Sequence, residues 1–295
     1  MPGTTGTTTS PLHPSASLAR AVSDAALAAA WAAHAQLEGG GHRKPGRAAR
    51  THQARKLLKQ VRALARLWRG AVPDAERREV DRQARDLGRA LSEAREATVL
   101  RETAAGLGLD PDRLGLADAA RAPWRPETRA ALVQQAEALA QRIQAVAPDQ
   151  GGFDLLAPGL SHTWREGRRG LRAARPDAHA EQMHEWRKVV KARMLQERLL
   201  VPAWPEVLGP TVAALDELQE LLGDHHDLHV LAEYLKTLQV QSQDELSDRI
   251  AQRQQALATR AFHLGDRLYA GQAEGWSGLL GGWVHAWWSE STPHA

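Results

Sequence analysis

Along most of the chain, hydrophobic residues recur every three or four positions with polar residues between them, which is the spacing of amphipathic α-helices. No strand-rich segment interrupts this pattern. Before a break at residues 148–152, it predicts helices over about residues 18–37, 48–69, 74–107 and 127–146. After the break, it predicts helices over about residues 160–174, 177–200, 206–239 and 242–270. We therefore expect an all-α protein.

The composition supports helix and narrows the chemistry. The chain has 295 residues, is rich in Ala, Leu, Arg and Gln, and contains only 5% aromatic residues, which favours helix throughout. It has no cysteine, so disulfides, thiolate metal ligands and cysteine nucleophiles are excluded.

Neither end of the chain resembles a targeting or membrane segment. Residues 1–17 are rich in Thr, Pro and Ser and predict a disordered tail rather than a signal peptide. Residues 273–295 form a Gly- and Trp-rich extension whose apolar part is too short to span a bilayer. We expect the extension to pack on the second half of the protein, and contact with a partner or a membrane surface is the alternative. The protein is expected to be soluble and cytoplasmic.

One motif, His-x-x-Arg-Lys-x-x-Lys, occurs in two of the predicted helices, and we call its copies the first and second box. The first box is His52, Arg55, Lys56 and Lys59, and the second box is His184, Arg187, Lys188 and Lys191. On a helix these four positions fall within about 100° of one another, so they share one face. Arg62 and Arg66 extend the first box along the same face. Because a surface built for solubility normally mixes both charges, such a positive face predicts a site for an anion.

The use of lysine also distinguishes the boxes. The chain has six Lys among its 38 basic residues, and four of the six are Lys56, Lys59, Lys188 and Lys191. Arg holds oxyanions as a rigid bidentate fork, whereas Lys places a compact charge on a flexible stem. Both together suit a ligand with many phosphate oxygens at different angles.

The similarity between the two halves extends beyond the boxes. Residues 87–100 parallel residues 218–231 at an offset of 131, close to the offset of 132 between the boxes. Two copies of about 130 residues with four helices each predict two four-helix bundles. The parallel segments carry acids that we interpret as ion-pair partners of the box cations, namely Glu93, Glu96, Asp224 and Asp227.

The two boxes and the downstream segment Leu222-Gly223-Asp224-His225-His226-Asp227-Leu228 resemble the CHAD family, the conserved histidine α-helical domain. The resemblance covers about residues 18–272, in halves 18–148 and 152–272. It implies two four-helix bundles related by a pseudo-twofold internal repeat, around a central basic channel that binds inorganic polyphosphate. It also implies a cytoplasmic protein that is often found at polyphosphate granules.

The basic positions of the family match residues in both halves of this chain. They are His52, Arg55, Lys56, Lys59 and Arg62 in the first half, and His184, Arg187, Lys188 and Lys191 in the second. Where relatives often carry a second basic pair and an aromatic residue, this chain has Ala192, Met194 and Leu195, and Arg193 falls on the apolar side of the helix. Many relatives also contain a strand-rich triphosphate-processing domain, which the pattern here does not predict. We therefore expect the binding module alone.

A third positive stripe lies on the predicted helix 160–174. It consists of Arg165, Arg168, Arg169 and Arg172, which fall within about 100° of one another. We predict that these arginines contact the ligand, so that the second half contributes more to the site than the first. Pairing with acids such as Glu166 is the alternative.

The histidines allow different interpretations. A ligand phosphate would favour the protonated forms of His52 and His184, whereas a neutral imidazole that donates to a backbone carbonyl is the alternative. His225 and His226 belong to a residue type that ligates metals, but adjacent residues on a helix point about 100° apart. We therefore expect no metal site.

These features together predict non-catalytic binding of inorganic polyphosphate, without a cofactor. No nucleophile with its base, Gly-rich phosphate loop or acidic metal cluster is recognisable, so we do not expect an enzyme. One alternative is a nucleic-acid-binding helical protein, although the basic faces lack interleaved aromatic residues. The other alternative is a metal-dependent phosphohydrolase that uses the region of His225 and His226.

Overall fold

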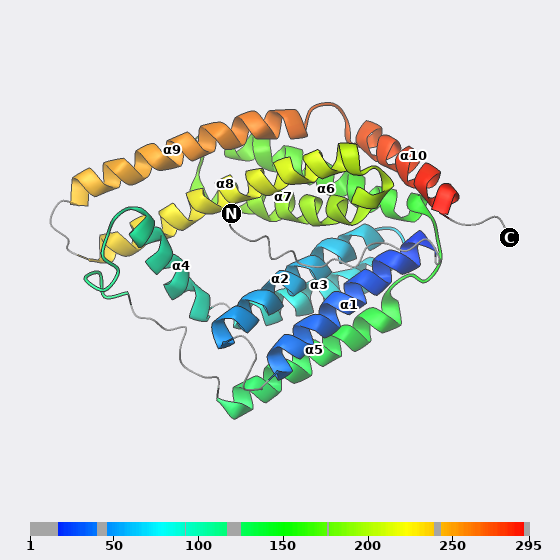
Figure 1. Cartoon of the computed structure of the whole chain (residues 1–295), viewed down its shortest axis with the longest axis horizontal. Helices are drawn as coiled ribbons and strands as arrows, with labels where there is room; N and C mark the ends of the chain where they lie inside the picture. Colours follow the sequence, from blue (N-terminus) through cyan, green and yellow to red (C-terminus); the bar gives the residue numbers. More distant parts are fainter. Residues whose placement is uncertain are drawn as a thin grey trace.

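The computed structural model describes residues 17–39, 46–91, 93–116, 125–175, 177–238 and 243–291, and the side chains within these ranges except those of residues 93–98 and 243. Apart from one isolated β-bridge between Arg69 and Val72, the regular structure in these ranges is helical (Figure 1). The predicted all-α fold class is therefore confirmed. Except for Ser17, the predicted tail lies outside the described residues. None of the described helices is both long enough and apolar enough to cross a membrane.

Four helices from the first half of the chain pack around one hydrophobic core (Figure 1). They are α1 (Leu18–Glu38), α2 (Arg47–Ala65), α3 (Asp74–Ala90) and α5 (Pro126–Val146), and we call them the first helix group. Leu37, Leu58, Leu87 and Leu139 each come from a different one of these helices and are fully buried in this core. Because α2 turns its leucines inward, its box residues remain on the opposite side.

The predicted single helix over residues 74–107 is wrong, because the chain forms two helices there. The first, α3, ends at Ala90, and α4 spans Glu93–Gly106. Leu91 is buried in the core of the first helix group, whereas Ala104 is buried in a second core, where α4 packs against α8. A straight helix cannot reach both cores, so tertiary packing overrides the continuous helical pattern.

The second hydrophobic core lies among helices from the second half of the chain. They are α6 (Phe153–Ala174), α7 (Ala180–Leu200), α8 (Pro205–Thr237) and α9 (Gln243–Leu268), and we call them the second helix group. Trp186 of α7 is fully buried between Gly170 of α6 and Gly265 of α9. A Cβ atom at either glycine would lie 2.8 Å from the indole ring, so both glycines are needed for this packing.

The start of α6 also differs from the prediction. The helix begins at Phe153 rather than at about residue 160. Its additional turns bury Leu156 in the core of the first helix group, which stabilises helix in a segment that contains Pro158.

The two helix groups meet where α6 and α7 contact the end of α2 and the short helix η1 (Arg66–Trp68). A Cβ atom at Gly159 of α6 would lie 2.5 Å from the backbone oxygen of Arg66, so glycine permits this approach. Nearby, the buried side chain of Gln196 donates from Nε2 to the backbone oxygen of Ala63 at 2.8 Å. These contacts hold the C-terminal end of α2 and η1 against α6 and α7.

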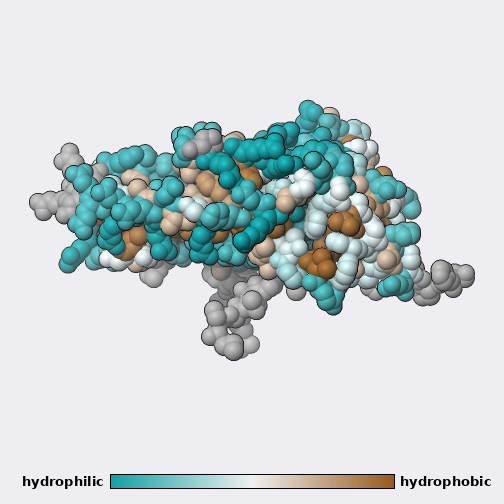
Figure 2. All heavy atoms as spheres, turned by 90° about the horizontal axis from the view of Figure 1, so that it is seen from above, coloured by the Kyte–Doolittle hydropathy of each residue, from teal (hydrophilic) through white to brown (hydrophobic). Residues whose placement is uncertain are grey.

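The Gly- and Trp-rich extension forms α10 (Ala273–Ser291), which packs on α6 and on η3 (Val201–Ala203). Trp276 contacts both hydrophobic cores, whereas Trp283 and Trp287 pack against the core of the first helix group. We expected the extension to pack on the second half of the protein. Instead, it covers one end of both groups (Figure 1). In the view of Figure 2, hydrophilic residues cover most of the face, and hydrophobic residues are most visible on the α10 side.

Arg193, which the helical spacing places on the apolar side of α7, forms a buried ion pair. Its Nε donates to Oε1 of Glu197 at 2.6 Å, and its Nη1 donates to the backbone oxygen of Leu268 at 2.7 Å. The guanidinium also lies over the ring of Tyr269. On α10, Trp276 donates from Nε1 to the same carboxylate oxygen at 2.9 Å. The ion pair therefore ties α7, the end of α9 and α10 together.

We predict that Arg193→Met lowers the free energy of unfolding by about 3–5 kcal/mol, because it leaves the Glu197 carboxylate buried without a counter-ion. Chemical denaturation followed by circular dichroism would measure the loss. Adding Glu197→Gln, which removes the charge but keeps an acceptor for Trp276, should recover most of the lost free energy of unfolding. As a control, Arg260→Met breaks an exposed pair with Glu217 and should cost about 1 kcal/mol or less. A loss for Arg193→Met no larger than that of the control would contradict this account.

Candidate functional site

A cleft with a volume of about 1050 Å³ lies between the two helix groups, and we call it the basic cleft. Its described lining includes ten Lys and Arg residues against three Glu residues. The cations are Arg55, Lys59, Arg62, Arg66, Arg85, Arg89, Arg169, Arg187, Lys188 and Lys191, and the acids are Glu166, Glu181 and Glu185. Charge of one sign in a hollow between low-dielectric walls focuses the potential, so the cleft attracts anions.

The packing of α2 against α7 brings the two boxes to the same cleft. Each helix buries its apolar face in the core of its own group, with Leu58 on α2 and Trp186 on α7. The polar faces remain, and the cleft lies between them. Of the residues that the sequence predicts for the site, the lining contains Arg55, Lys59, Arg62, Arg169, His184, Arg187, Lys188 and Lys191.

Lys191 shows the electrostatic effect of this arrangement. Its Nζ donates to Oε1 of Gln219 at 3.3 Å. Burial, followed by the charge of Arg187, lowers the pKa of Lys191 to about 8. The charge of Lys56 in the first box adds to this effect, although Lys56 itself is not part of the cleft lining. The boxes are therefore close enough to repel each other, and an anion between them would relieve the repulsion.

Corresponding arginines of the two boxes each reach a glycine on a neighbouring helix. Arg55 donates from Nη1 to the backbone oxygen of Gly88 on α3 at 3.3 Å. Arg187 lies against α8 at Gly223, where a Cβ atom would come within 2.5 Å of Nη2. Any side chain at residue 223 would therefore displace the guanidinium, which explains a glycine in the interior of this helix.

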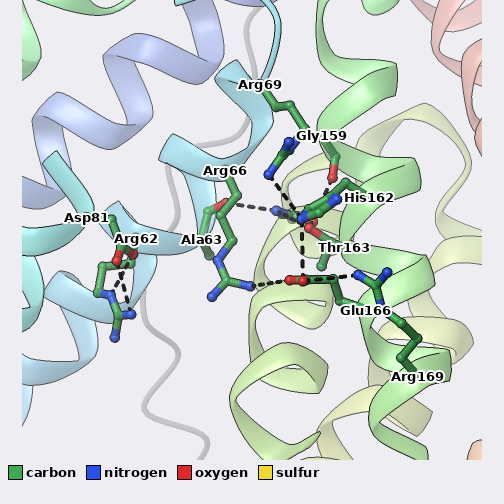
Figure 3. Close-up of polar contacts among 11 residues, drawn as sticks. Arg62, Ala63, Arg66, Arg69, Asp81, Gly159, His162, Thr163, Glu166 and Arg169 are labelled. Atoms are coloured by element: carbon green, nitrogen blue, oxygen red, sulfur yellow. Dashed lines mark hydrogen bonds and ion pairs between the residues drawn. The ribbon is translucent and has the colours of Figure 1, made fainter. Parts of the chain in front are cut away.

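The structure shows ion pairs to acids that were not singled out from the sequence. Arg62 pairs with Asp81 on α3 at 2.9 Å, and Arg198 pairs with Asp216 on α8 at 3.2 Å (the first pair is shown in Figure 3). The predicted partners were Glu93, Glu96, Asp224 and Asp227. The side chains of the two glutamates lie outside the described residues, and Asp224 is exposed. The register between neighbouring helices, which periodicity does not encode, brings Asp81 to Arg62 and Asp216 to Arg198.

The histidine of the second box lies against another histidine. The ring centroids of His184 on α7 and His226 on α8 are 4.2 Å apart. Burial lowers the pKa of both imidazoles, to about 4 for His226, and the charge of Lys188 lowers that of His184 further. The lowered pKa values favour the neutral form of both rings at pH 7. No carbonyl accepts from either Nδ1, because both atoms are buried without a hydrogen-bond partner among the described residues. His52 is exposed on α2 and outside the cleft lining.

The region of His225 and His226 was the candidate for metal binding. His225 is buried on α8, and burial lowers the pKa of its imidazole, with a smaller contribution from His229. In the part of the chain that the structure describes, no three His, Asp or Glu side chains are arranged to hold a metal ion.

The arginine stripe on α6 divides between two sides of the helix. Arg169 lines the basic cleft. Arg165 instead pairs with Glu274 of α10, and Arg168 donates from Nη1 to the backbone oxygen of Gly271 at 2.8 Å. Arg168 and Arg172 line a separate cavity of about 320 Å³. The four arginines span an arc of about 100° on α6, which is wide enough to face two neighbouring elements. Helical spacing alone therefore could not show that Arg169 points to the cleft and the other three do not.

Two of the cleft cations were not identified from the sequence. Arg85 and Arg89 lie one turn apart on α3 and line the cleft opposite α7. They follow Arg78 and Arg82 at helical spacing, and this spacing is the signal by which they could have been found. Arg66 continues the stripe of the first box one turn beyond Arg62 and also reaches the lining.

Comparison with known proteins identifies the family. The sequence model of the CHAD domain matches residues 19–236. The crystal structure of the CHAD domain from the plant Ricinus communis superposes with a TM-score of 0.55 and 18% sequence identity. The match covers 90% of this chain and 96% of that chain, so the two share the fold. No protein with a curated description matches significantly. The family match extends over both boxes and all of the basic cleft, and this chain therefore belongs to the CHAD family.

Proposed function

We propose that this protein binds inorganic polyphosphate in the basic cleft without catalysing a reaction. The observation that carries the proposal is the convergence of both boxes on one cleft, where ten Lys and Arg face three Glu among the described residues. Membership of the CHAD family supports it, since CHAD domains are associated with polyphosphate binding in general. Cytoplasmic residence and association with polyphosphate granules belong to the same proposal.

The proposal includes an internal repeat. The first and second helix groups are its two halves, related by a pseudo-twofold axis, and α2 in one corresponds to α7 in the other. The matching boxes on these two helices support the relation, as does their packing against each other. The basic cleft is then the central channel between the halves.

A polyphosphate chain suits the charge and the geometry of the cleft. It carries about one negative charge per phosphate unit, so several charge-assisted hydrogen bonds form at once. The cations come from α2, η1, α3, α6 and α7, and therefore approach a ligand from different directions. The arginines supply forked donors, and Lys59, Lys188 and Lys191 supply compact charges on flexible stems. Burial, followed by repulsion from Arg187, lowers the pKa of Lys191, and a bound anion would relieve the repulsion.

The lining favours phosphates without bases over nucleic acid. Single-stranded nucleic acids bind largely by stacking their bases on exposed aromatic side chains. Among the described lining residues the aromatic ring systems are those of Trp186 and His184. Trp186 is fully buried in the second core, and His184 stacks on His226. Trp186 therefore offers no face to a base, and one face of His184 is already covered.

The same lining supports binding without catalysis. None of its described residues is Ser, Thr, Cys, Tyr or Asp, the usual hydroxyl, thiol and aspartate nucleophiles.

The most direct test of the cleft reverses two of its charges. We predict that Lys188→Glu with Lys191→Glu weakens binding of long-chain polyphosphate by about 100-fold or more, since two charge-assisted contacts of about 1.5 kcal/mol each are lost. Fluorescence polarisation with labelled polyphosphate would measure the affinity. The matched control is Lys236→Glu with Arg260→Glu, which changes the net charge equally at exposed positions outside the lining. Unchanged affinity in a folded Lys188 and Lys191 variant would remove the second box from the site.

Binding is also expected to depend on pH through Lys191. With a pKa of about 8, its ammonium is largely charged at pH 7 and largely neutral at pH 9, so binding at pH 9 requires the uptake of a proton. The affinity for polyphosphate should therefore fall by roughly tenfold between pH 7 and pH 9 at constant ionic strength. Lys191→Arg, which keeps its charge over this range, should flatten the profile. An identical profile for Lys191→Arg would show that another group causes the pH dependence.

A further inference from the structure

Glu166 on α6 is an acid in the middle of the cations that line the basic cleft (Figure 3). Its Oε1 lies 3.2 Å from Nη2 of Arg169 and 3.5 Å from Nε2 of His162. Its Oε2 lies 3.9 Å from Nη1 of Arg66. Burial lowers the pKa of His162 and outweighs the raising effect of Glu166, so this imidazole is neutral at pH 7. The charges that Glu166 neutralises are therefore those of the two arginines.

The contact between Glu166 and Arg66 joins the two helix groups. Arg66 opens η1 at the end of α2, whereas Glu166 and Arg169 belong to α6. The two elements are held together two helical turns before Glu166, where the backbone of Gly159 touches that of Arg66. The buried hydrogen bond from Gln196 to the backbone of Ala63 stabilises the same junction. The fold thus fixes Glu166 beside Arg66 rather than leaving the pair to side-chain flexibility.

The contact with Glu166 leaves one hydrogen-bond donor of Arg66 without an acceptor among the described residues. Nη1 of Arg66 is buried and has no hydrogen-bond partner among the described residues, since 3.9 Å is an ion-pair distance and not a hydrogen bond. Burial lowers the pKa of this guanidinium, which measures the cost of keeping its charge there. A buried guanidinium nitrogen without an acceptor, on an arginine that lines an anion-attracting cleft, indicates that an oxyanion completes the site.

We propose that Glu166 is an internal counter-anion, which holds Arg66 and Arg169 until the phosphates of a bound polyphosphate take both arginines from it. This inference rests on the proposed function and adds a residue that sets its affinity. The displacement costs free energy, because the carboxylate repels phosphate and loses its two arginine partners. This cost is the same for a short and for a long ligand. A chain of many phosphates offsets that cost through its contacts with the boxes, whereas a single phosphate ion does not.

Glu185 provides a matched comparison within the same lining. Its carboxylate pairs with Lys188 at 2.5 Å on the same helix, and its side chain is 63% exposed against 34% for Glu166. Both residues place one negative charge at the cleft, but Glu185 engages a rim lysine that solvent already screens. Both substitutions therefore share the general electrostatic effect of removing one charge, whereas release of the partly buried Arg66, together with Arg169, is specific to Glu166.

The test compares Glu166→Gln with Glu185→Gln. We expect Glu166→Gln to tighten the binding of long-chain polyphosphate by about five- to tenfold, and Glu185→Gln by no more than about twofold. In an Arg169→Gln background the gain from Glu166→Gln should shrink, because one of the released partners is gone. Thermal melting would confirm the fold of each variant, and Glu166→Ala would replace Glu166→Gln if that variant did not fold.

Two results would overturn the inference while leaving the proposed function intact. If wild type binds polyphosphate and Glu166→Gln gains no more than Glu185→Gln, Glu166 is not displaced by the ligand. If Glu166→Gln binds more weakly than wild type, the carboxylate positions the arginines for the ligand instead of competing with it. Failure of the wild type to bind polyphosphate would instead refute the proposed function itself.

Discussion

Mutual repulsion among the cations of the basic cleft is the constraint on which the rest of the structure depends. Among the described residues, ten Lys and Arg line one cleft, and the charges of Arg187 and Lys56 add to the effect of burial in lowering the pKa of Lys191. Such a lining persists only if other parts of the protein hold it in place. Two hydrophobic cores, one on each side of the cleft, provide that stability. Acids such as Asp81 beside the cleft and Glu166 within it neutralise individual cations without removing the excess of positive charge.

Close contacts of small or buried groups keep the two sides at a fixed distance. Gly159 lets α6 touch η1, and Gln196 supplies a buried hydrogen bond between the helix groups. On the far side of α7, the ion pair of Arg193 and Glu197 joins α9 and α10 to the same helix. The second box therefore lies on a helix that is held on both faces. Cations on a helix that is held in this way need little reorganisation to bind a ligand. Such pre-organisation lowers the free-energy cost of binding and so favours tighter binding.

Much of the fold and about half of the cleft could be predicted from the sequence. Helical periodicity located most helices, and the repeated box identified α2 and α7 as the helices that carry the charge. Periodicity could not predict the contacts between helices. The break near Leu91 arises because α3 and α4 pack in different cores, and the separation of Arg169 from Arg165 arises because α6 has two neighbours. Asp81 depends on the register between α2 and α3. Periodicity describes one helix at a time, and these features belong to pairs of helices.

The central claim is that the basic cleft is built for a chain of phosphates without bases. The measurement that tests it most directly is the affinity for long-chain polyphosphate over a series of salt concentrations, with a single-stranded oligonucleotide of equal charge alongside. The account predicts tight binding of polyphosphate that weakens steeply with salt, and much weaker binding of the oligonucleotide at every concentration. Equal or tighter binding of the oligonucleotide, or no binding of polyphosphate at low salt, would contradict it.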